Sequence, residues 1–544
     1  MPVSAQVYLP PEAGLVVRPG LRVRPGLRVR PCSEDLRLEH ACMNRDDAAR
    51  GNRGSAVMAG TSDNATLVKH KAGFAGGILV FLFFVLVPLG LEPMIQRMLG
   101  VLALCAIWWG TEAISIYATA LLPAVLLPLL GILPLKDALS PYANRLIFLF
   151  LGGFLIARAM MKWGVDRRLA LGILGRVGKS SKMLVLYFMG LTAFLSAFIS
   201  NTATTAMMLP IGLAIITNSK LKAESKYGTV LLLGIAYAST IGGVATLVGT
   251  PPNVLLAGFS QQLLGYEISF FEWLKVGLPY AIVMLPLTWW FLWIVHKPKA
   301  LTIDSADTIE QERKLLGPLE RGGKYTIAAF ILVATLWLTR PFWDIIPHPF
   351  VPLLQSRFDD ALIAMFCAVL LFVVPTSVKK WEFPLVWADT RAISFGILYL
   401  FGGGLALGKG LFESGAAAWI AESLPLSASL HPFLLIMIVT IIASFVSEIA
   451  SNTAVANMMI PLLIAVGTAI NVSPFLLAIP ATVACSNVFM LPISTPPNAI
   501  VYGSGKLGIS EMMRTGFWLH LIGLVVMAIT VYLLSGKVFG MFPV

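Results

Sequence analysis

Two short polar motifs recur in a very apolar chain. Ser200-Asn201-Thr202 is matched by Ser451-Asn452-Thr453, and Thr250-Pro251-Pro252-Asn253 is matched by Thr495-Pro496-Pro497-Asn498. Inside a bilayer every backbone N–H and C=O needs a partner, so a helix breaks only where the break is buried or lines a cavity. The helix that begins at such a break would attract a carboxylate or sulfate, and the carbonyls of the helix that ends there would suit Na⁺. The motifs therefore predict two related sites for anions and cations.

Ordinary helix packing is the alternative explanation, because Ser, Asn and Thr also hydrogen-bond between membrane helices, at about 0.6 kcal/mol per bond. The second copy, with its own Pro-Pro pair, favours broken helices, since Pro cannot continue a helix without losing backbone hydrogen bonds. A third pair of segments, the glycine-rich 150–155 and 400–405, occurs in the same order. The offset of about 250 residues indicates an internal duplication, far longer than a solenoid repeat.

The composition indicates an all-α, multi-span membrane protein. Apolar residues make up 57% of the chain and charged residues 12%, mean hydropathy is +0.82, and soluble domains carry about 25% charged residues. A helix needs about 20 apolar residues to cross the hydrocarbon. In the first half we expect spans or half-spans near 73–92, 99–117, 118–134, 184–200, 203–218, 228–248 and 273–296. In the second half we expect them near 325–340, 361–376, 432–450, 453–471, 475–493 and 517–536.

Two glycine-rich stretches, 146–164 and 396–415, are long enough to span but also contain charged residues. We expect re-entrant helical hairpins there, because each stretch precedes a Ser-Asn-Thr motif at a similar distance. The alternative is a pair of ordinary helices whose small residues let neighbouring helices approach closely.

The chain is expected to consist of a tail, two membrane repeats and a linker. The expected boundaries are 1–71 for a disordered polar tail, 72–296 for the first repeat, 297–324 for a polar linker and 325–544 for the second repeat. The tail has no long apolar run, and a misassigned start is an alternative origin for it. Lys69, Lys71 and the basic linker favour a cytoplasmic N-terminus and linker. The net charge of +12 lies largely in such loops and does not indicate a nucleic-acid partner.

The motifs, taken in this order, resemble the divalent anion:sodium symporter family, and the stretch 108–113 (WWGTEA) adds to a resemblance that covers 72–544. Members of this family, such as the bacterial sodium/dicarboxylate symporters, carry di- and tricarboxylates or sulfate. The resemblance implies two inverted-topology repeats that form a scaffold and an elevator-type transport domain. It also implies a homodimer in the cell (inner) membrane and co-transport of at least two Na⁺ ions.

The resemblance implies roles for individual residues as well. The first sodium site would comprise Ser196, Ser200, Asn201 and Gly249. The second sodium site would comprise Ser447, Ala450, Asn452 and Ser494. The substrate would meet Asn201, Thr202, Thr250, Pro251, Ser451, Asn452, Thr453, Thr495 and Pro496. This set has no cationic side chain, so anion binding would depend on helix ends, hydroxyls, amides and bound Na⁺.

The implied function is sodium-coupled symport of a C4-dicarboxylate such as succinate, malate or fumarate. Sodium-independent dicarboxylate exchange and transport of citrate or sulfate are alternatives within the family, and a channel or an intramembrane enzyme are alternatives outside it. We do not expect an enzyme, because the sequence has no HExxH or GxSxG motif and no His near either Ser-Asn-Thr. ATP-driven transport is not expected either, since a GxxxxGK[ST] phosphate loop is absent.

Two ionisable residues within expected spans, Glu448 and His520, are weighed separately. Glu448 is a functional candidate by its position, but we expect it to make a structural pair with an Arg or with backbone groups. A proton-relay role for His520 is the less favoured interpretation. The five cysteines have no spacing typical of a zinc site, an iron–sulfur cluster or a disulfide framework.

Overall fold

The computed structural model describes residues 67–174, 180–218, 226–298, 306–345, 357–423 and 430–539. The tail expected at 1–71 lies almost wholly outside these ranges, as does part of the linker expected at 297–324. The described residues belong to one compact unit, Leu67–Val544, and they fold into helices. Ten of these helices are long and apolar enough to cross a membrane, which confirms the expectation of an all-α, multi-span protein.

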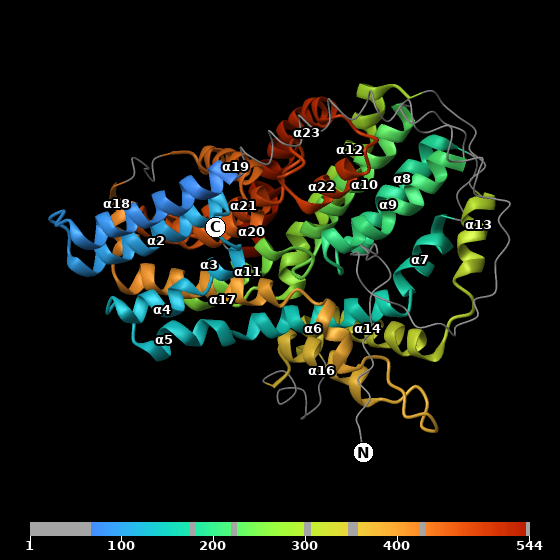
Figure 1. The fold of residues 1–544 in the computed structure, drawn as a ribbon, viewed down its shortest axis with the longest axis horizontal. Helices are drawn as coiled ribbons and strands as arrows, with labels where there is room; N and C mark the ends of the chain where they lie inside the picture. Colours follow the sequence, from blue (N-terminus) through green and yellow to red (C-terminus); the bar gives the residue numbers. More distant parts are fainter. Residues whose placement is uncertain are drawn as a thin grey trace, which may run out of the picture. The chain divides into compact units, whose positions relative to one another are not determined.

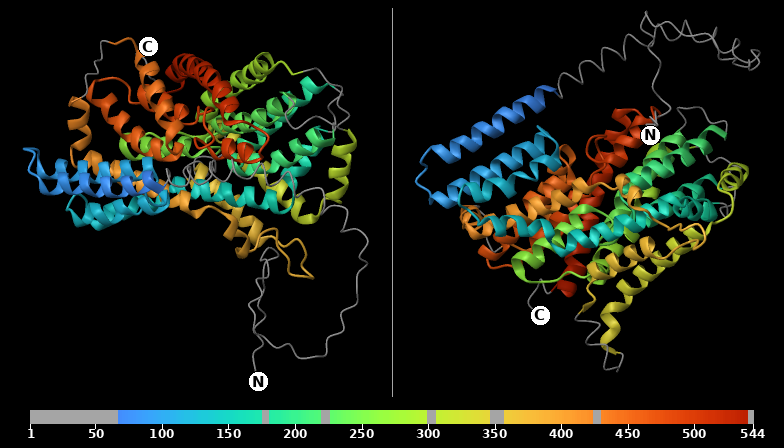
Figure 2. Two further views of the ribbon diagram at one scale, coloured as in Figure 1. Left: turned by 45° about the horizontal axis from the view of Figure 1, so that its top comes forward. Right: turned by 60° about the horizontal axis from the view of Figure 1, so that its bottom comes forward.

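The chain begins its described part with helices that precede the glycine-rich stretch at 146–164. They are Leu67–Leu86, α2 (Pro93–Thr111), α3 (Ile116–Thr119), α4 (Leu122–Leu129), α5 (Leu135–Leu139) and η1 (Ser140–Ala143). The first of these packs along α2, where the rings of Phe74 and Trp108 stack with centroids 5.1 Å apart (Figure 2). The span expected at 118–134 is divided between α3 and α4, because Pro123 occupies the first turn of α4 and restarts the helix there.

Seven helices of the first half have counterparts in the second half, in the same order (Figure 1). The first set is α6 (Arg145–Lys162), α7 (Val165–Leu174), α8 (Ser181–Ser196), α9 (Asn201–Asn218), α10 (Lys226–Ala245), α11 (Pro251–Leu264) and α12 (Phe270–His296). The second set is α17 (Phe395–Glu413), α18 (Ala416–Ser423), α19 (Pro432–Ile449), α20 (Asn452–Ala469), α21 (Phe475–Cys485), α22 (Pro496–Gly503) and α23 (Ile509–Thr530). Between the sets lie α13 (Ala306–Leu315), α14 (Arg321–Thr339), η2 (Arg340–Ile345), α16 (Asp360–Val373) and η3 (Trp387–Ala392).

A glycine in the left-handed conformation ends the first helix of each set. Gly164 follows α6 with φ of 60°, and Gly415 follows α17 with φ of 76°. Glycine adopts this conformation without the steric cost that a Cβ would add. The same residue type therefore turns the chain out of α6 into α7 and out of α17 into α18.

Two ion pairs fix the relative direction of α6 and α17. Lys162, the last residue of α6, lies with its Nζ 2.7 Å from Oδ2 of Asp389, shortly before α17. Lys409, four residues before the end of α17, lies with its Nζ 2.8 Å from Oδ1 of Asp137, shortly before α6. Each helix thus ends where the other begins, so α6 and α17 run antiparallel. Because both are spans by length and composition, the two repeats cross the membrane in opposite directions, as in inverted-repeat transporters.

The prediction of re-entrant hairpins at 146–164 and 396–415 is wrong, because α6 and α17 are continuous helices. Their glycines are packing positions instead. A Cβ on Gly152 would lie 2.7 Å from the backbone carbonyl carbon of Ala364 in α16, and a Cβ on Gly403 would collide with the carbonyl oxygen of Ala120. Close approach of neighbouring helices therefore explains these glycines.

Each Ser-Asn-Thr motif lies where two helices are joined by a short turn, namely α8–α9 and α19–α20. Only residues 197–200 separate α8 from α9, and only Ala450 and Ser451 separate α19 from α20. Next to the first pair lies α10, whose span is wholly buried and which packs against α8, α9, α12 and α22. The breaks predicted at the two Ser-Asn-Thr motifs are thus confirmed, and the buried helix α10 packs against the helices of the first break.

Candidate functional site

At the first helix break, between α8 and α9, three oxygen atoms lie close together. Oγ of Ser196, at the end of α8, lies 2.6 Å from Oδ1 of Asn201 and 2.7 Å from the carbonyl oxygen of Ser239 in α10. A hydroxyl carries one proton, so Ser196 can donate to one of these oxygens and leaves the other with a free lone pair. Hydroxyl and carbonyl oxygens at an unwound helix are the ligands that transporters offer to Na⁺.

The second break repeats this cluster. Oγ of Ser447, near the end of α19, lies 3.0 Å from Oδ1 of Asn452 and 2.8 Å from the carbonyl oxygen of Cys485 at the end of α21. The serine, the asparagine, the contacting atoms and the helices correspond to those of the first break, and Cys485 takes the place of Ser239. We call the two groups the Ser196 cluster (Ser196, Asn201, Ser239) and the Ser447 cluster (Ser447, Asn452, Cys485).

Ser200 and Gly249 were also predicted for the first sodium site. Oγ of Ser200 accepts a hydrogen bond from the backbone N–H of Ala203 at 3.3 Å, so it caps the start of α9. Gly249 approaches the Ser196 cluster through Gly243. A Cβ on Gly249 would collide with the carbonyl of Gly243, and a Cβ on Gly243 would collide with the amide of Asn201. Close packing of Gly249 against Gly243, and of Gly243 against Asn201, therefore leaves no room for a Cβ at either glycine.

Ala450 and Ser494 were predicted for the second sodium site. Ala450 follows α19 in an extended conformation, with φ of −134° and ψ of 164°. Ser494 lies in the segment between α21 and α22, where its Oγ donates to the carbonyl of Leu491 at 2.7 Å and accepts from Nδ2 of Asn498 at 3.2 Å. Ser494 makes no direct hydrogen bond to Ser447 or Asn452 among the described contacts, so it belongs to the neighbouring segment of the site.

The Thr-Pro-Pro-Asn motifs start α11 and α22. Thr250 and Thr495 are the residues before these helices, and each is extended, with φ of −142° and −143°. Pro251 and Pro496 occupy the first helical position, where a missing N–H costs no hydrogen bond. Both threonines are buried, and neither hydroxyl caps its helix.

The asparagines of these motifs hold the chain that precedes α11 and α22. Nδ2 of Asn253 donates to the carbonyl of Thr246 at 2.8 Å and lies 3.3 Å from that of Gly243. Nδ2 of Asn498 donates to the carbonyl of Leu491 at 3.1 Å. Both side chains are fully buried, and Oδ1 of each has no hydrogen-bond partner in the structure. The two amides thus leave equivalent acceptor atoms unused beside the site.

Exposure differs between the cluster serines and the Ser-Asn-Thr motifs. The hydroxyls of Ser196 and Ser447 are fully buried. The Ser-Asn-Thr residues predicted to meet the substrate are more accessible, namely Asn201, Thr202, Ser451, Asn452 and Thr453. None of the described hydrogen bonds of these five residues involves a Lys or Arg side chain. The site therefore combines an accessible layer of polar residues, the two Ser-Asn-Thr motifs, with the buried hydroxyl oxygens of Ser196 and Ser447.

Helices of the two repeats pack against each other at the site. α9, which begins in the first Ser-Asn-Thr motif, packs against α22 of the second repeat. α20, which begins in the second Ser-Asn-Thr motif, packs against α11 of the first repeat. Each Ser-Asn-Thr helix thus lies against the Pro-Pro helix of the other repeat, which brings the four predicted motifs into one assembly.

Sequence reasoning missed several members of this site. The carbonyls of Ser239 and Cys485 could not be recognised, because every residue carries a carbonyl and only the fold selects one. Ser444, three residues before Ser447, has a fully buried Oγ that contacts Nε2 of His520 at 3.1 Å. Glu448 does face backbone groups, as expected, and it also contacts Nδ1 of His520 at 3.1 Å.

The sequence and fold were compared with known proteins. The family model described as "Sodium:sulfate symporter transmembrane region" matches residues 71–541. The sodium-dependent dicarboxylate transporter SdcS of Staphylococcus saprophyticus is 42% identical over 481 residues, which cover 86% of this chain and 92% of that protein. SdcS of Staphylococcus aureus strain USA300 is 40% identical over 497 residues, which cover 87% of this chain and 94% of that protein.

Two solved structures share the fold at low sequence identity. The YdaH transporter of Alcanivorax borkumensis is 16% identical, with a TM-score of 0.51 over 86% of this chain and 100% of that chain. MtrF of Neisseria gonorrhoeae is 13% identical, with a TM-score of 0.55 over 84% of this chain and 98% of that chain. Because the family model spans most of the chain and the relatives match along nearly their whole length, this protein belongs to the sodium:sulfate symporter family.

Proposed function

We propose that this protein is a secondary active transporter that moves a C4-dicarboxylate, such as succinate, malate or fumarate, together with at least two Na⁺ ions. The observation that carries the proposal is the pair of equivalent oxygen clusters at Ser196 and Ser447, each directly beside an accessible Ser-Asn-Thr motif. The names of the relatives, sodium-dependent dicarboxylate transporters, support the same substrate class.

Sodium binding and substrate binding are coupled through charge in this proposal. A dicarboxylate brings two negative charges to a site whose motif residues are uncharged. The N–H groups at the start of α9 and α20 and the hydroxyls of Thr202 and Thr453 offer hydrogen bonds to the carboxylates. Two Na⁺ ions in the buried clusters supply the compensating positive charge. Substrate affinity should therefore rise with the Na⁺ concentration.

Alternating access would move the site helices past α17. Two hydrogen bonds currently join these parts, from Nε2 of Gln262 to the carbonyl of Leu405 at 2.8 Å and from Nδ2 of Asn457 to the carbonyl of Leu400 at 3.2 Å. An elevator-type movement of α8–α11 and α19–α22 requires both bonds to exchange partners. We further propose a homodimer in the cell (inner) membrane, as the family resemblance implies. We also propose a cytoplasmic N-terminus, since Lys69 and Lys71 lie at the start of the first span, Leu67–Leu86.

Uptake of labelled succinate into proteoliposomes tests the proposal. We expect saturable uptake that depends on external Na⁺ and rises steeply with its concentration, because two ions bind with each substrate. Equal uptake in choline and in sodium would refute symport and favour dicarboxylate exchange. Uptake that does not saturate with succinate would favour a channel. Citrate and sulfate, added as competitors, establish whether the site prefers a tricarboxylate or an inorganic anion.

A further inference from the structure

The two repeats differ where α10 and α21 end. Ser239 and Cys485 occupy equivalent places, since the carbonyl of each contacts the cluster serine of its own repeat. In the first repeat the helix continues from Ser239 to Ala245, whereas in the second repeat it ends at Cys485. Residues 486–495 are not helical. The span expected at 475–493 is therefore cut short, and the second repeat has an unwound segment where the first has helix.

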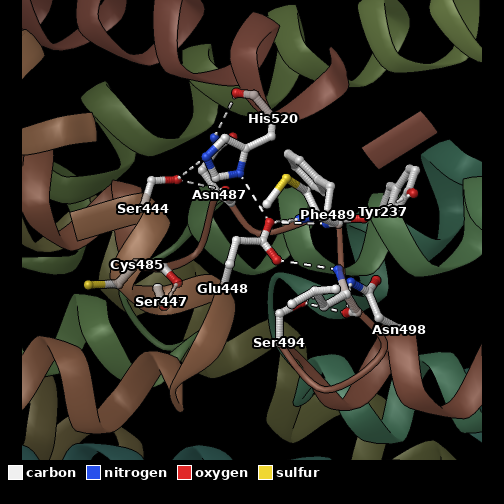
Figure 3. Close-up of polar contacts among 12 residues, drawn as sticks. Tyr237, Ser444, Ser447, Glu448, Cys485, Asn487, Phe489, Ser494, Asn498 and His520 are labelled. Atoms are coloured by element: carbon white, nitrogen blue, oxygen red, sulfur yellow. Dashed lines mark hydrogen bonds and ion pairs between the residues drawn. The ribbon is translucent and has the colours of Figure 1, made fainter. Parts of the chain in front are cut away.

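Glu448 supplies acceptors for the N–H groups of this unwound segment. Its Oε1 accepts from the backbone N–H of Phe489 at 2.8 Å and of Met490 at 3.0 Å, and its Oε2 lies 3.4 Å from the N–H of Leu491 (Figure 3). The Glu448 side chain is 1% exposed. Buried N–H groups without a partner are costly, so the carboxylate replaces the hydrogen bonds that a continued helix would have provided.

The first repeat has no acidic residue at the corresponding place. The residue after the cluster serine is Glu448 in the second repeat and Ala197 in the first. The carbonyl of Ala197 accepts a hydrogen bond from the hydroxyl of Thr246, and this neutral contact joins the two turns of the first repeat. A carboxyl group therefore lies beside the Ser447 cluster, and the residue at the corresponding place beside the Ser196 cluster is apolar.

His520 lies on the other side of the Glu448 carboxylate. Its Nδ1 is 3.1 Å from Oε1 of Glu448, and its Nε2 is 3.1 Å from Oγ of Ser444, which also lies 3.0 Å from the carbonyl of Asn487 (Figure 3). All these contacts are satisfied together when both ring nitrogens carry a proton, because Ser444 then donates to Asn487. Nδ2 of Asn487 in turn donates to the carbonyl of His520 at 3.2 Å. The imidazole thus orients the carboxylate without replacing its backbone contacts.

We propose that Glu448 is a positioning residue for sodium binding at the Ser447 cluster. By fixing residues 489–491 it holds the segment that leaves Cys485, whose carbonyl belongs to the cluster, and that leads to Ser494. The inference rests on the proposed function for its sodium part, and it makes the two sodium sites unequal, with the second site dependent on a buried carboxyl group.

The test compares Glu448→Gln with His520→Gln in the full chain, reconstituted in proteoliposomes. Gln retains the length of Glu448 but has one acceptor oxygen and no charge. We expect the half-saturating Na⁺ concentration for succinate uptake to rise about tenfold or more in Glu448→Gln, with the rate at saturating Na⁺ within about twofold of wild type. His520→Gln keeps the carboxylate and its three N–H contacts, so its half-saturating Na⁺ concentration should stay within about threefold of wild type.

A purely structural role predicts a different result. Both variants would then lose folded protein and maximal rate, with an unchanged half-saturating Na⁺ concentration, and that result overturns the proposal. If Glu448→Gln alone does not fold because Nδ1 of the buried His520 loses its carboxyl partner, the double variant Glu448→Gln/His520→Gln removes both groups. The same rise in half-saturating Na⁺ concentration is expected of the double variant, and an unchanged value overturns the proposal.

Hydrogen exchange separates this inference from the proposed function. In detergent-solubilised protein, the amides of residues 489–491 should exchange faster in the Gln variants of Glu448 than in wild type or in His520→Gln. Wild-type uptake that is independent of Na⁺ would refute the proposed symport, and the exchange measurement would then decide the positioning role alone. Unchanged exchange at residues 489–491 would refute that role even if uptake depends on Na⁺.

Discussion

The rings of Phe150 and Phe401 meet edge to face, with centroids 5.0 Å apart and an interplanar angle of 84°. Gly164 and Gly415, which end α6 and α17, are 251 residues apart (415 − 164), and so are Phe150 and Phe401 (401 − 150), so the two phenylalanines occupy corresponding positions in these helices. A residue that contacts its own counterpart lies beside the axis that relates the two copies, so the pseudo-two-fold axis of the repeats passes between these helices. The Lys162–Asp389 and Lys409–Asp137 pairs lie toward opposite ends of the same two helices.

Loss of either motif asparagine should abolish transport. Asn201→Ala and Asn452→Ala each remove one oxygen from a cluster and one amide from the accessible layer. Loss of a hydrogen bond to a charged group costs about 1.5–3 kcal/mol, which corresponds to at least a tenfold fall in succinate uptake at subsaturating substrate. Thr468→Ala is a matched control, because the exposed Thr468 lies in the same helix as Asn452 and bonds only to the carbonyl of Ile464. Normal uptake in both Asn variants would exclude the motifs from the site.

Neighbouring glycines in α6 should respond in opposite ways to a methyl group. Gly152→Ala places a Cβ 2.7 Å from the backbone of Ala364, whereas Gly153→Ala meets nothing within 4 Å. Overpacking costs about 1–3 kcal/mol, and Ala in an open helical position gains up to about 1 kcal/mol over Gly. Thermal unfolding in detergent should therefore show a lower melting temperature for Gly152→Ala and an equal or higher one for Gly153→Ala. Equal melting temperatures would show that α6 and α16 can separate.

The Lys162–Asp389 pair should stabilise the protein at neutral pH. Burial by itself raises the pKa of Asp389, but the hydrogen bond from Lys162, the N–H of Val386 and nearby positive charges outweigh it and hold the pKa below its ordinary value. A lowered pKa in the folded state contributes stability above the unfolded-state pKa, and that contribution is lost as the pH falls through the folded-state pKa.

Asp389→Asn should therefore lower the melting temperature at pH 7, because it removes a partly exposed ion pair. Such a pair contributes about 1 kcal/mol to the free energy of unfolding. The difference from wild type should remain at about pH 5 and shrink as the pH falls below the ordinary Asp pKa of about 3.9. Asp359→Asn, which removes a different partly exposed ion pair with Arg145, tests whether the effect is specific to the α6–α17 contact. A difference that grows on acidification would contradict the assigned sign.

Opposite ends of the α6–α17 pair should be accessible from opposite sides of the membrane. Lys136 is exposed next to Asp137, and Lys380 is exposed in the connection before η3, at the other end of the pair. Single cysteines at these positions, in a background without the five native cysteines, can be labelled in intact cells with a membrane-impermeant thiol reagent. One position should react before the cells are opened and the other only afterwards. Labelling of both from outside would contradict the inverted topology.

The sequence by itself determined the features that depend on composition and local chemistry. Apolar length established the spans, and the paired Ser200–Thr202 and Ser451–Thr453 motifs, with the Pro-Pro pairs, located the helix breaks, because Pro removes an N–H wherever it stands. The duplication was visible because corresponding motifs recur in the same order. These properties belong to residue types and do not require knowledge of what they contact.

The tertiary structure decided everything that depends on a partner distant in the chain. Gly152 and Gly403 indicated hairpins in isolation, but Ala364 and Ala120 show that they make room for close helix contacts. The partner of Glu448 was not evident from its helix, because its acceptors meet N–H groups of residues 489–491, which are free only where α21 ends early. Backbone groups are the same in every residue, so only the fold can determine which of them remain available to a side chain or an ion.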